Sequence, residues 1–119
     1  MLCGALGALL YHVNAVTAQE TRRITPEGFE FSTATRSFKY HYPRKYARGT
    51  AYSGTWIAES AEGVRPNFVI HSAGFKPTAE TTVLYFSLEN TANDFPAGLY
   101  RLEIKADGKL VRTERFFIR

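Results

Sequence analysis

The sequence predicts an all-β domain folded as an antiparallel β-sandwich, and three observations lead to this prediction. Short apolar and aromatic runs alternate with polar residues at a period of two, which is typical of half-buried strands. Turn signals built from Gly, Asp and Pro recur about every ten residues. All five prolines lie at the ends of the apolar runs, where strands tolerate them. Because two strands are not stable alone in water, these strands need an opposing layer that covers their apolar faces.

Length and composition are those of a single globular domain. The chain has 119 residues, of which 45% are hydrophobic and 14% aromatic. This content is ample for one core and too apolar for a disordered segment. The net charge of +4 is spread unevenly, since residues 36–48 carry five Lys or Arg and no Asp or Glu. The basic character of the chain is therefore local.

The first eighteen residues differ in composition from the rest of the chain. They contain no Asp, Glu, Lys or Arg and end in Val16-Thr17-Ala18, with small or β-branched residues at positions −3 and −1. This pattern predicts a secretory signal peptide over residues 1–18, cleaved after Ala18. The alternatives are a buried N-terminal helix and a membrane anchor, but His12 and Asn14 interrupt the apolar run and disfavour a stable membrane span. We expect an exported protein, periplasmic or extracellular, in which residues 1–18 are helical or irregular and pack poorly against the domain.

The remainder divides into an N-terminal arm, residues 19–27, and the sandwich domain, residues 28–119. The arm is polar and is expected to be extended or to form a short edge strand. Cys3 is the only cysteine and lies in the signal segment. The domain after cleavage would contain none, so neither a disulfide nor a cysteine-ligated metal site is expected there.

Alternation assigns the strands of the domain in order, giving seven to eight in all. Trp56 is the lone tryptophan and lies on the apolar face of one of these strands. The predicted strands are Phe29–Phe31, Phe38–Tyr42, Ala51–Glu59, Asn67–Phe75, Thr81–Glu89 and the two strands of a hairpin within Phe95–Arg119. The residues expected to be most buried are Trp56, Leu84, Phe86, Leu88, Tyr100, Leu102 and Ile104.

The terminal hairpin turns at Asp107-Gly108, a dipeptide that tolerates the positive φ of a tight turn. Neither a two-residue nor a three-residue loop puts all the apolar residues of the last strand on one face. A β-bulge between Arg112 and Arg115 would reset the alternation. We therefore expect Val111, Phe116 and Ile118 all to face the core.

The ending of the chain follows the pattern P-x-G-x-Y, then D-G-K, then F-x-I. The residues are Pro96 to Tyr100, Asp107 to Lys109 and Phe116 to Ile118, with Trp56-Ile57-Ala58 upstream. These motifs resemble small immunoglobulin-like modules of exported bacterial proteins. The resemblance implies an immunoglobulin-like sandwich over residues 28–119 and specifies no activity. Leu102 stands where antibody-type domains have their second core cysteine, so an antigen-receptor function is not implied.

Residues 36–48, RSFKYHYPRKYAR, form the most distinctive candidate binding surface. Cations interleaved with aromatic rings suit anionic polymers, because Arg and Lys meet phosphates or sulfates while bases or sugars stack on tyrosines. In the alternative interpretation, Phe38, Tyr40 and Tyr42 form a core face and only residues 43–48 are an exposed basic loop. The binding candidates are then Arg44, Lys45, Tyr46 and Arg48.

No pattern points to catalysis, a metal or a cofactor. His41 and His71 occur singly, each on the expected outward face of a strand, and the G-x-S-x-G motif is absent. The sequence therefore indicates a non-enzymatic exported module with a structural role or an unidentified protein partner. The alternative is a module that binds an anionic polymer, polysaccharide rather than nucleic acid. A protease inhibitor is a third class, although none of the loop motifs of such inhibitors is present.

Overall fold

The described part of the chain is built from strands. The computed structural model describes residues 16–18, 23–25, 28–42, 49–77, 84–90 and 93–119. These residues contain no helix, which confirms the predicted all-β class. The strands are β1 (Thr17–Ala18), β2 (Arg23–Thr25), β3 (Gly28–Phe31), β4 (Ser37–His41), β5 (Tyr52–Ala61), β6 (Phe68–Phe75), β7 (Tyr85–Glu89), β8 (Gly98–Ala106) and β9 (Lys109–Ile118).

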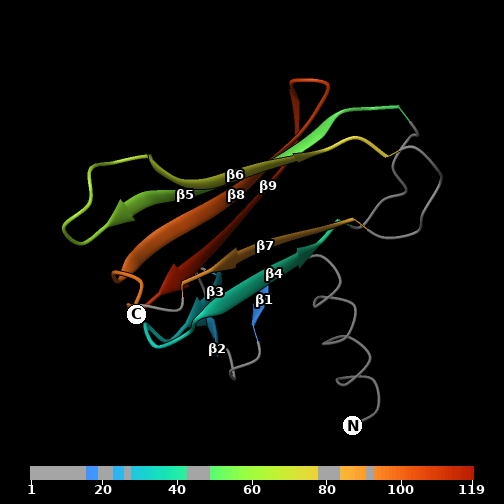
Figure 1. Ribbon diagram of the computed structural model, residues 1–119. Helices are drawn as coiled ribbons and strands as arrows, with labels where there is room; N and C mark the ends of the chain where they lie inside the picture. Colours follow the sequence, from blue (N-terminus) through green and yellow to red (C-terminus); the bar gives the residue numbers. More distant parts are fainter. Residues whose placement is uncertain (1–15, 19–22, 26–27, 43–48, 78–83, 91–92) are drawn as a thin grey trace, which may run out of the picture.

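The strands form two sheets that face each other (Figure 1). The smaller sheet has the order β1-β4-β7 and the larger the order β2-β3-β9-β8-β5-β6. Neighbouring strands are antiparallel, except that β3 runs parallel to β9 and pairs through Glu30↔Phe117 and Phe31↔Ile118. Strand β2 is an edge strand, as the sequence predicts for the N-terminal arm. The layers are those of a β-sandwich.

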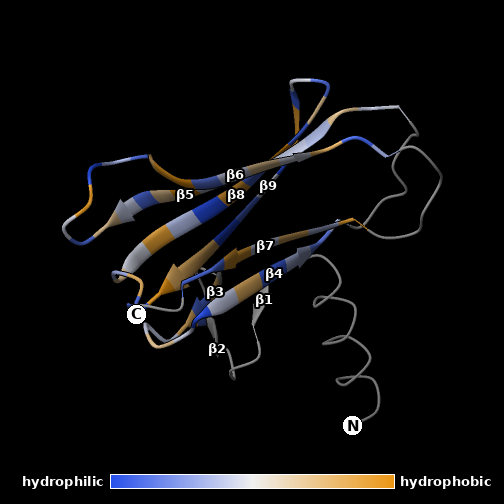
Figure 2. Ribbon diagram, viewed as in Figure 1, coloured by the Kyte–Doolittle hydropathy of each residue, from blue (hydrophilic) through white to orange (hydrophobic). Residues whose placement is uncertain are grey.

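Both sheets contribute side chains to one core. Phe38 of β4 packs on Phe116 of β9 with ring centroids 5.0 Å apart, and Trp56 of β5 meets the same ring edge-on at 6.1 Å. Apolar and polar residues alternate along β8 in Figure 2, as a strand with one buried face requires. All of the residues predicted to be most buried are buried: Trp56, Leu84, Phe86, Leu88, Tyr100, Leu102 and Ile104.

Strand β7 lies opposite β5 because Gly54 leaves room for an aromatic ring. A Cβ atom at Gly54 would lie 2.2 Å from Cδ1 of Phe86, so the ring of Phe86 occupies the place of that side chain. A glycine in a strand often marks such a close approach. This contact sets how far the smaller sheet extends beneath the larger one.

The terminal hairpin turns at Asp107-Gly108 as predicted, with a two-residue loop, and it contains the predicted β-bulge, but the bulge lies elsewhere. Asp107 and Gly108 adopt φ values of 50° and 80°. The ladder pairs Lys105 with Leu110 and then Ile104 with Arg112, so Val111 is the extra residue. The predicted position between Arg112 and Arg115 is therefore wrong. Val111 itself is exposed, also contrary to expectation, whereas Phe116 and Ile118 are buried as expected.

The early bulge places two charged residues on the core side of β9. Arg112 and Glu114 alternate with Phe116 and are paired with each other, Nε to Oε2, at 2.7 Å. Glu114 Oε2 also accepts a hydrogen bond from the Tyr40 hydroxyl at 3.0 Å. Burial, together with the Glu114 carboxylate, raises the pKa of Tyr40. Because the charges are paired and hydrogen-bonded, the sandwich tolerates them on this face.

The hydroxyl of Tyr100 fastens the start of β8 to the preceding chain. It donates a hydrogen bond to the carbonyl oxygen of Pro96, four residues upstream. Burial raises the pKa of Tyr100 to about 12. In the unfolded chain a tyrosine titrates near pH 10. The stabilisation from this neutral hydroxyl is therefore fully present below about pH 10 and is lost as the pH rises through about 12.

We expect ionisation of Tyr100 to lower the free energy of unfolding by about 2 kcal/mol between about pH 10 and 12, since one pKa unit corresponds to about 1.4 kcal/mol. Urea unfolding at a series of alkaline pH values, with tyrosinate absorbance followed in parallel, measures this. The variant Tyr100→Phe should show a smaller alkaline loss. An identical loss in the variant would show that Tyr100 does not cause it.

The last residues of the predicted signal segment are part of the sandwich. Thr17 pairs with Lys39 and Ala18 with Phe38, which makes β1 the edge neighbour of β4. Val16 is buried in the core. The expectation of poor packing is therefore wrong for residues 16–18, because β4 offers them a ladder and an apolar contact. Residues 1–15 lie outside the described part of the chain.

Candidate functional site

The two sheets end unequally on one side of the sandwich. Strand β6 is the last strand of the larger sheet and β7 the last of the smaller one. Because β7 lies opposite β5, the smaller sheet ends one strand earlier. Among the described residues, no strand lies beside the free edge of β7 or opposite β6. We call the side of the molecule formed by β6 and β7 the open side.

Strand β6 directs aromatic side chains toward the space beyond β7. Residues directly opposed in an antiparallel pair point to the same face of a sheet. Phe75 is opposite Tyr52 and Phe68 is opposite Ala58, and both of these β5 residues are buried in the core. Phe68 and Phe75 therefore lie on the core side of the larger sheet, yet 38% and 48% of their surface is exposed. They are exposed because the smaller sheet does not reach beneath them.

A cleft of about 360 Å³ lies between the two edge strands. Its described lining consists of Ile70 and His71 from β6 and Ser87, Leu88 and Glu89 from β7. Leu88 belongs to the buried core and Ile70 packs against it. The cleft thus combines an apolar floor with polar groups and strand backbone at its rim.

The free edge of β7 presents backbone groups as well as side chains. The amide of Tyr42 donates to the Leu84 carbonyl at 2.8 Å, and the amide of Asn90 donates to the Arg36 carbonyl at 2.9 Å. In an antiparallel ladder the residues that bond to one neighbour alternate with residues that point away from it. The N–H and C=O groups of the odd-numbered residues of β7 therefore point away from β4. These residues are Tyr85, Ser87 and Glu89, and all three are exposed.

The edge strands of the open side carry few of the charges and prolines that protect exposed edges, although β6 has a bulge at Ile70. Proteins commonly protect exposed edges with Lys, Pro, inward-pointing charges or bulges. Strand β6 contains no Asp, Glu, Lys, Arg or Pro, and β7 contains only Glu89. Seven of the eight residues of β6 are exposed. Both edges therefore have few features that oppose pairing with another strand.

The two histidines of the domain occupy different positions. His41 is half-buried and stacks on Tyr85 with ring centroids 4.1 Å apart, and its Nε2 is buried without a hydrogen-bond partner. His71 lies opposite Trp56 on the core side of β6, exposed, and lines the cleft. The predicted outward position of His71 is wrong, because Ile70 is an extra residue in the ladder and shifts the alternation. No group of metal-ligating side chains is found among the described residues.

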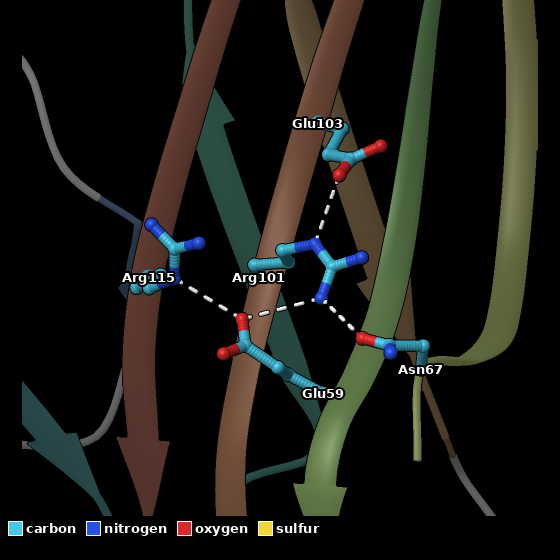
Figure 3. A network of polar contacts seen from close by, with 5 residues as sticks. All are labelled: Glu59, Asn67, Arg101, Glu103 and Arg115. Atoms are coloured by element: carbon cyan, nitrogen blue, oxygen red, sulfur yellow. Dashed lines mark hydrogen bonds and ion pairs between the residues drawn. The ribbon is translucent and has the colours of Figure 1, made fainter.

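The outer face of the larger sheet carries a network of ion pairs (Figure 3). Glu59 Oε1 accepts hydrogen bonds from Arg101 at 3.2 Å and from Arg115 at 3.1 Å. Arg101 also donates to Glu103 at 2.9 Å and to Asn67 Oδ1 at 2.7 Å. The network ties β5, β8 and β9 to the turn that precedes β6. Sequence reasoning missed this network, because Arg101 and Arg115 are distant from Glu59 in the sequence.

The candidate residues of the predicted basic loop, Arg44, Lys45, Tyr46 and Arg48, lie outside the described residues. Of the preceding aromatic residues, Phe38 and Tyr40 are buried and Tyr42 is partly buried against the core, which confirms the core-face interpretation for this strand. The rings of Phe38 and Tyr40 are therefore not available to stack on a polymer.

Binding of an anionic polymer by the basic loop remains a prediction with a direct test. Replacing Arg44, Lys45 and Arg48 together by Ala should abolish salt-dependent retention on heparin, because each contact with the polymer releases counterions. The urea midpoint should hardly change, since exposed charges contribute little to stability. Equal retention of the triple variant and the parent would remove this function from consideration.

No protein-family model matches the chain, and no curated protein matches it. Among the residues that the structure describes, none lies in a helix with the length and apolar character needed to cross a bilayer.

Proposed function

We propose that this protein is a non-enzymatic, exported immunoglobulin-like module that acts as a structural or protein-interaction domain. The observation that carries the proposal is the open side, where two edge strands with few charges and two exposed phenylalanines of the core face lie next to a cleft. Large exposed apolar groups at an unprotected strand edge are typical of surfaces that bind another protein.

Three features support the immunoglobulin-like assignment within the β-sandwich. The first strand of the domain, β3, runs parallel to the last strand, β9, while the other neighbours are antiparallel. Trp56 is buried on a central strand of the larger sheet. The bond from Tyr100 to Pro96 has the form of the tyrosine corner found at the start of the penultimate strand in such domains. The fold by itself does not specify a function, which is why the proposal depends on the open side.

The protein-interaction role predicts that a partner is captured through the open side. A double variant, Phe68→Ser with Phe75→Ser, should lose capture of partners from the exported protein fraction. The matched control, Leu110→Ser with Val111→Ser, also removes two exposed apolar side chains, which are 52% and 42% exposed. It should capture as the parent does. Equal capture by both double variants would contradict the proposed surface.

Export predicts that the exported protein begins at Gln19. Intact-mass spectrometry of protein purified from the exported fraction should show the loss of eighteen residues. Cleavage at that point would also remove Val16 and β1, so the processed protein should be less stable than the full chain by about 1.5 to 3 kcal/mol, the value of one fully buried Val side chain. An exported protein with Met1 intact would refute the processing.

A further inference from the structure

We propose that the open side binds a single extended segment of a partner protein, which adds as a strand to the free edge of β7 beneath β6. This inference rests on the proposed protein-interaction function and specifies its mode. The added strand would extend the smaller sheet by one strand. It would cover the core side of β6, which the smaller sheet leaves exposed.

The spacing of the sheets fits one strand in this place. Neighbouring strands lie about 4.8 Å apart within a sheet, and packed sheets lie about 10 Å apart. A strand paired with β7 would therefore lie opposite β6, as β7 lies opposite β5 through Phe86 and Gly54. It would cross the cleft, whose described lining comes from these two strands.

Backbone groups of β7 would bind the partner segment whatever the amino-acid sequence of that segment. The outward-pointing N–H and C=O groups of Tyr85, Ser87 and Glu89 would pair with the segment, as in other cases of β-strand addition. Antiparallel pairing is favoured because its hydrogen bonds are better aligned. Because β7 has five residues, five residues of the partner segment would pair with it.

The side chains define which segment fits. Residues opposite Phe86 and Leu88 would face the sandwich interior, because both of these residues are buried, and would enter the cleft that Ile70 and His71 line from β6. They should be apolar. The residue opposite Glu89 would lie on the outer face, where a cationic side chain forms the favourable cross-strand pair. The partner segment is therefore alternating, apolar at every second position, with Lys or Arg at the end that meets Glu89.

A second copy of the chain does not fit this site. In a two-fold pairing of two β7 strands, each copy would carry its own β5 above its own β7, because Phe86 packs against Gly54. Strand β6 of one copy extends beyond β5 into the same position. The two larger sheets would collide, whereas a single extended segment carries no second sheet into this position. A dimer paired through β6 would be a different assembly and is distinguished by the test.

Hydrogen exchange by NMR on the full chain tests the proposal. The probe is the capped peptide Lys-Val-Thr-Val-Thr, which places Lys opposite Glu89 and its two valines opposite Leu88 and Phe86. At about 10 mM, which is saturating for millimolar affinity, the amides of Ser87 and Glu89 should exchange about tenfold more slowly. The capped peptide Lys-Val-Pro-Val-Thr, which lacks the central donor, should leave them unchanged.

Two variants keep the test specific. Ser87→Pro removes an N–H that points away from β4, so it should abolish the protection by the peptide and leave the ladder between β4 and β7 intact. Glu89→Lys should weaken binding about two- to fivefold, on the scale of a lost cross-strand ion pair, and the peptide with Glu in place of Lys should restore it. Glu62→Lys makes the same charge change in the loop after β5 and should bind as the parent does.

The outcomes separate the mode of binding from the proposed function. Unchanged exchange at Ser87 and Glu89 with saturating peptide would overturn the added strand, and so would protection confined to β6. Concentration-dependent protection of β6 without peptide would indicate a dimer instead and would also overturn it. In each of these cases, loss of partner capture by the Phe68→Ser, Phe75→Ser variant would still support a protein-interaction module.

Discussion

Replacing Trp56 with alanine is expected to lower the free energy of unfolding by about 3 to 5 kcal/mol, the range measured for large aromatic residues in cores. Trp56 is 1% exposed, lies opposite Leu102 in the ladder and meets the ring of Phe116 edge-on. The variant would therefore leave a large cavity between the sheets. Domains of this size have only about 5 to 15 kcal/mol of stability, so most of the protein could be unfolded at growth temperature.

Urea unfolding followed by far-ultraviolet circular dichroism measures the effect. Val69→Ala is the matched control, because Val69 lies on β6 and is 53% exposed. Its cost should stay within about 0.5 kcal/mol. A loss below about 1 kcal/mol for Trp56→Ala would contradict the two-layered core.

Replacing Gly98 with alanine is expected to cost on the order of 2 to 3 kcal/mol, which is large for the addition of one methyl group. Gly98 begins β8 opposite Ala61 and has a φ of 156°. An added Cβ would lie 2.3 Å from the carbonyl oxygen of Ser60 and 2.5 Å from the Cα of Ala61. Both are backbone atoms, so they cannot rotate away, and the central ladder between β5 and β8 would have to shift.

The variant Gly63→Ala separates this clash from the effect of positive φ alone. Gly63 has a φ of 72°, but an added Cβ would meet no atom within 4 Å. It should cost about 1 kcal/mol, the typical penalty for a side chain in this conformation. Equal costs for the two variants in urea unfolding would show that β5 and β8 do not approach each other as closely as described.

Local patterns were sufficient to predict much of the sandwich. The alternation of Tyr100, Leu102 and Ile104, and the Asp107-Gly108 turn, depend on neighbouring residues only, and both predictions are confirmed. The need for a bulge also followed from the last strand, because a regular alternation could not bury its apolar residues. Its position depends on how β9 packs against β4, where Tyr40 reaches Glu114, and a single strand does not contain that information.

The open side could not be predicted, because it depends on the order of strands in two sheets. The sequence of β6 indicates a strand, but not that β5 is its only neighbour among the described residues or that the smaller sheet ends at β7. The extra residue Ile70, which turns His71 toward the cleft, is likewise visible only in the pairing with β5. The same holds for β1, whose residues were assigned to the signal segment from their composition. The absence of Asp, Glu, Lys and Arg from β6 is visible in the sequence, but it does not give the order of the strands.

Site-specific photocrosslinking in the exported fraction tests most directly whether the protein is an interaction module that binds through its open side. A photoreactive phenylalanine analogue would replace Ser87 at the free edge of β7 and, in a control, the exposed Ser32 between β3 and β4. We predict a discrete crosslinked partner from position 87 and none from position 32. Crosslinking of the same partner from both positions, or from position 32 alone, would contradict the assignment of the open side as the binding surface.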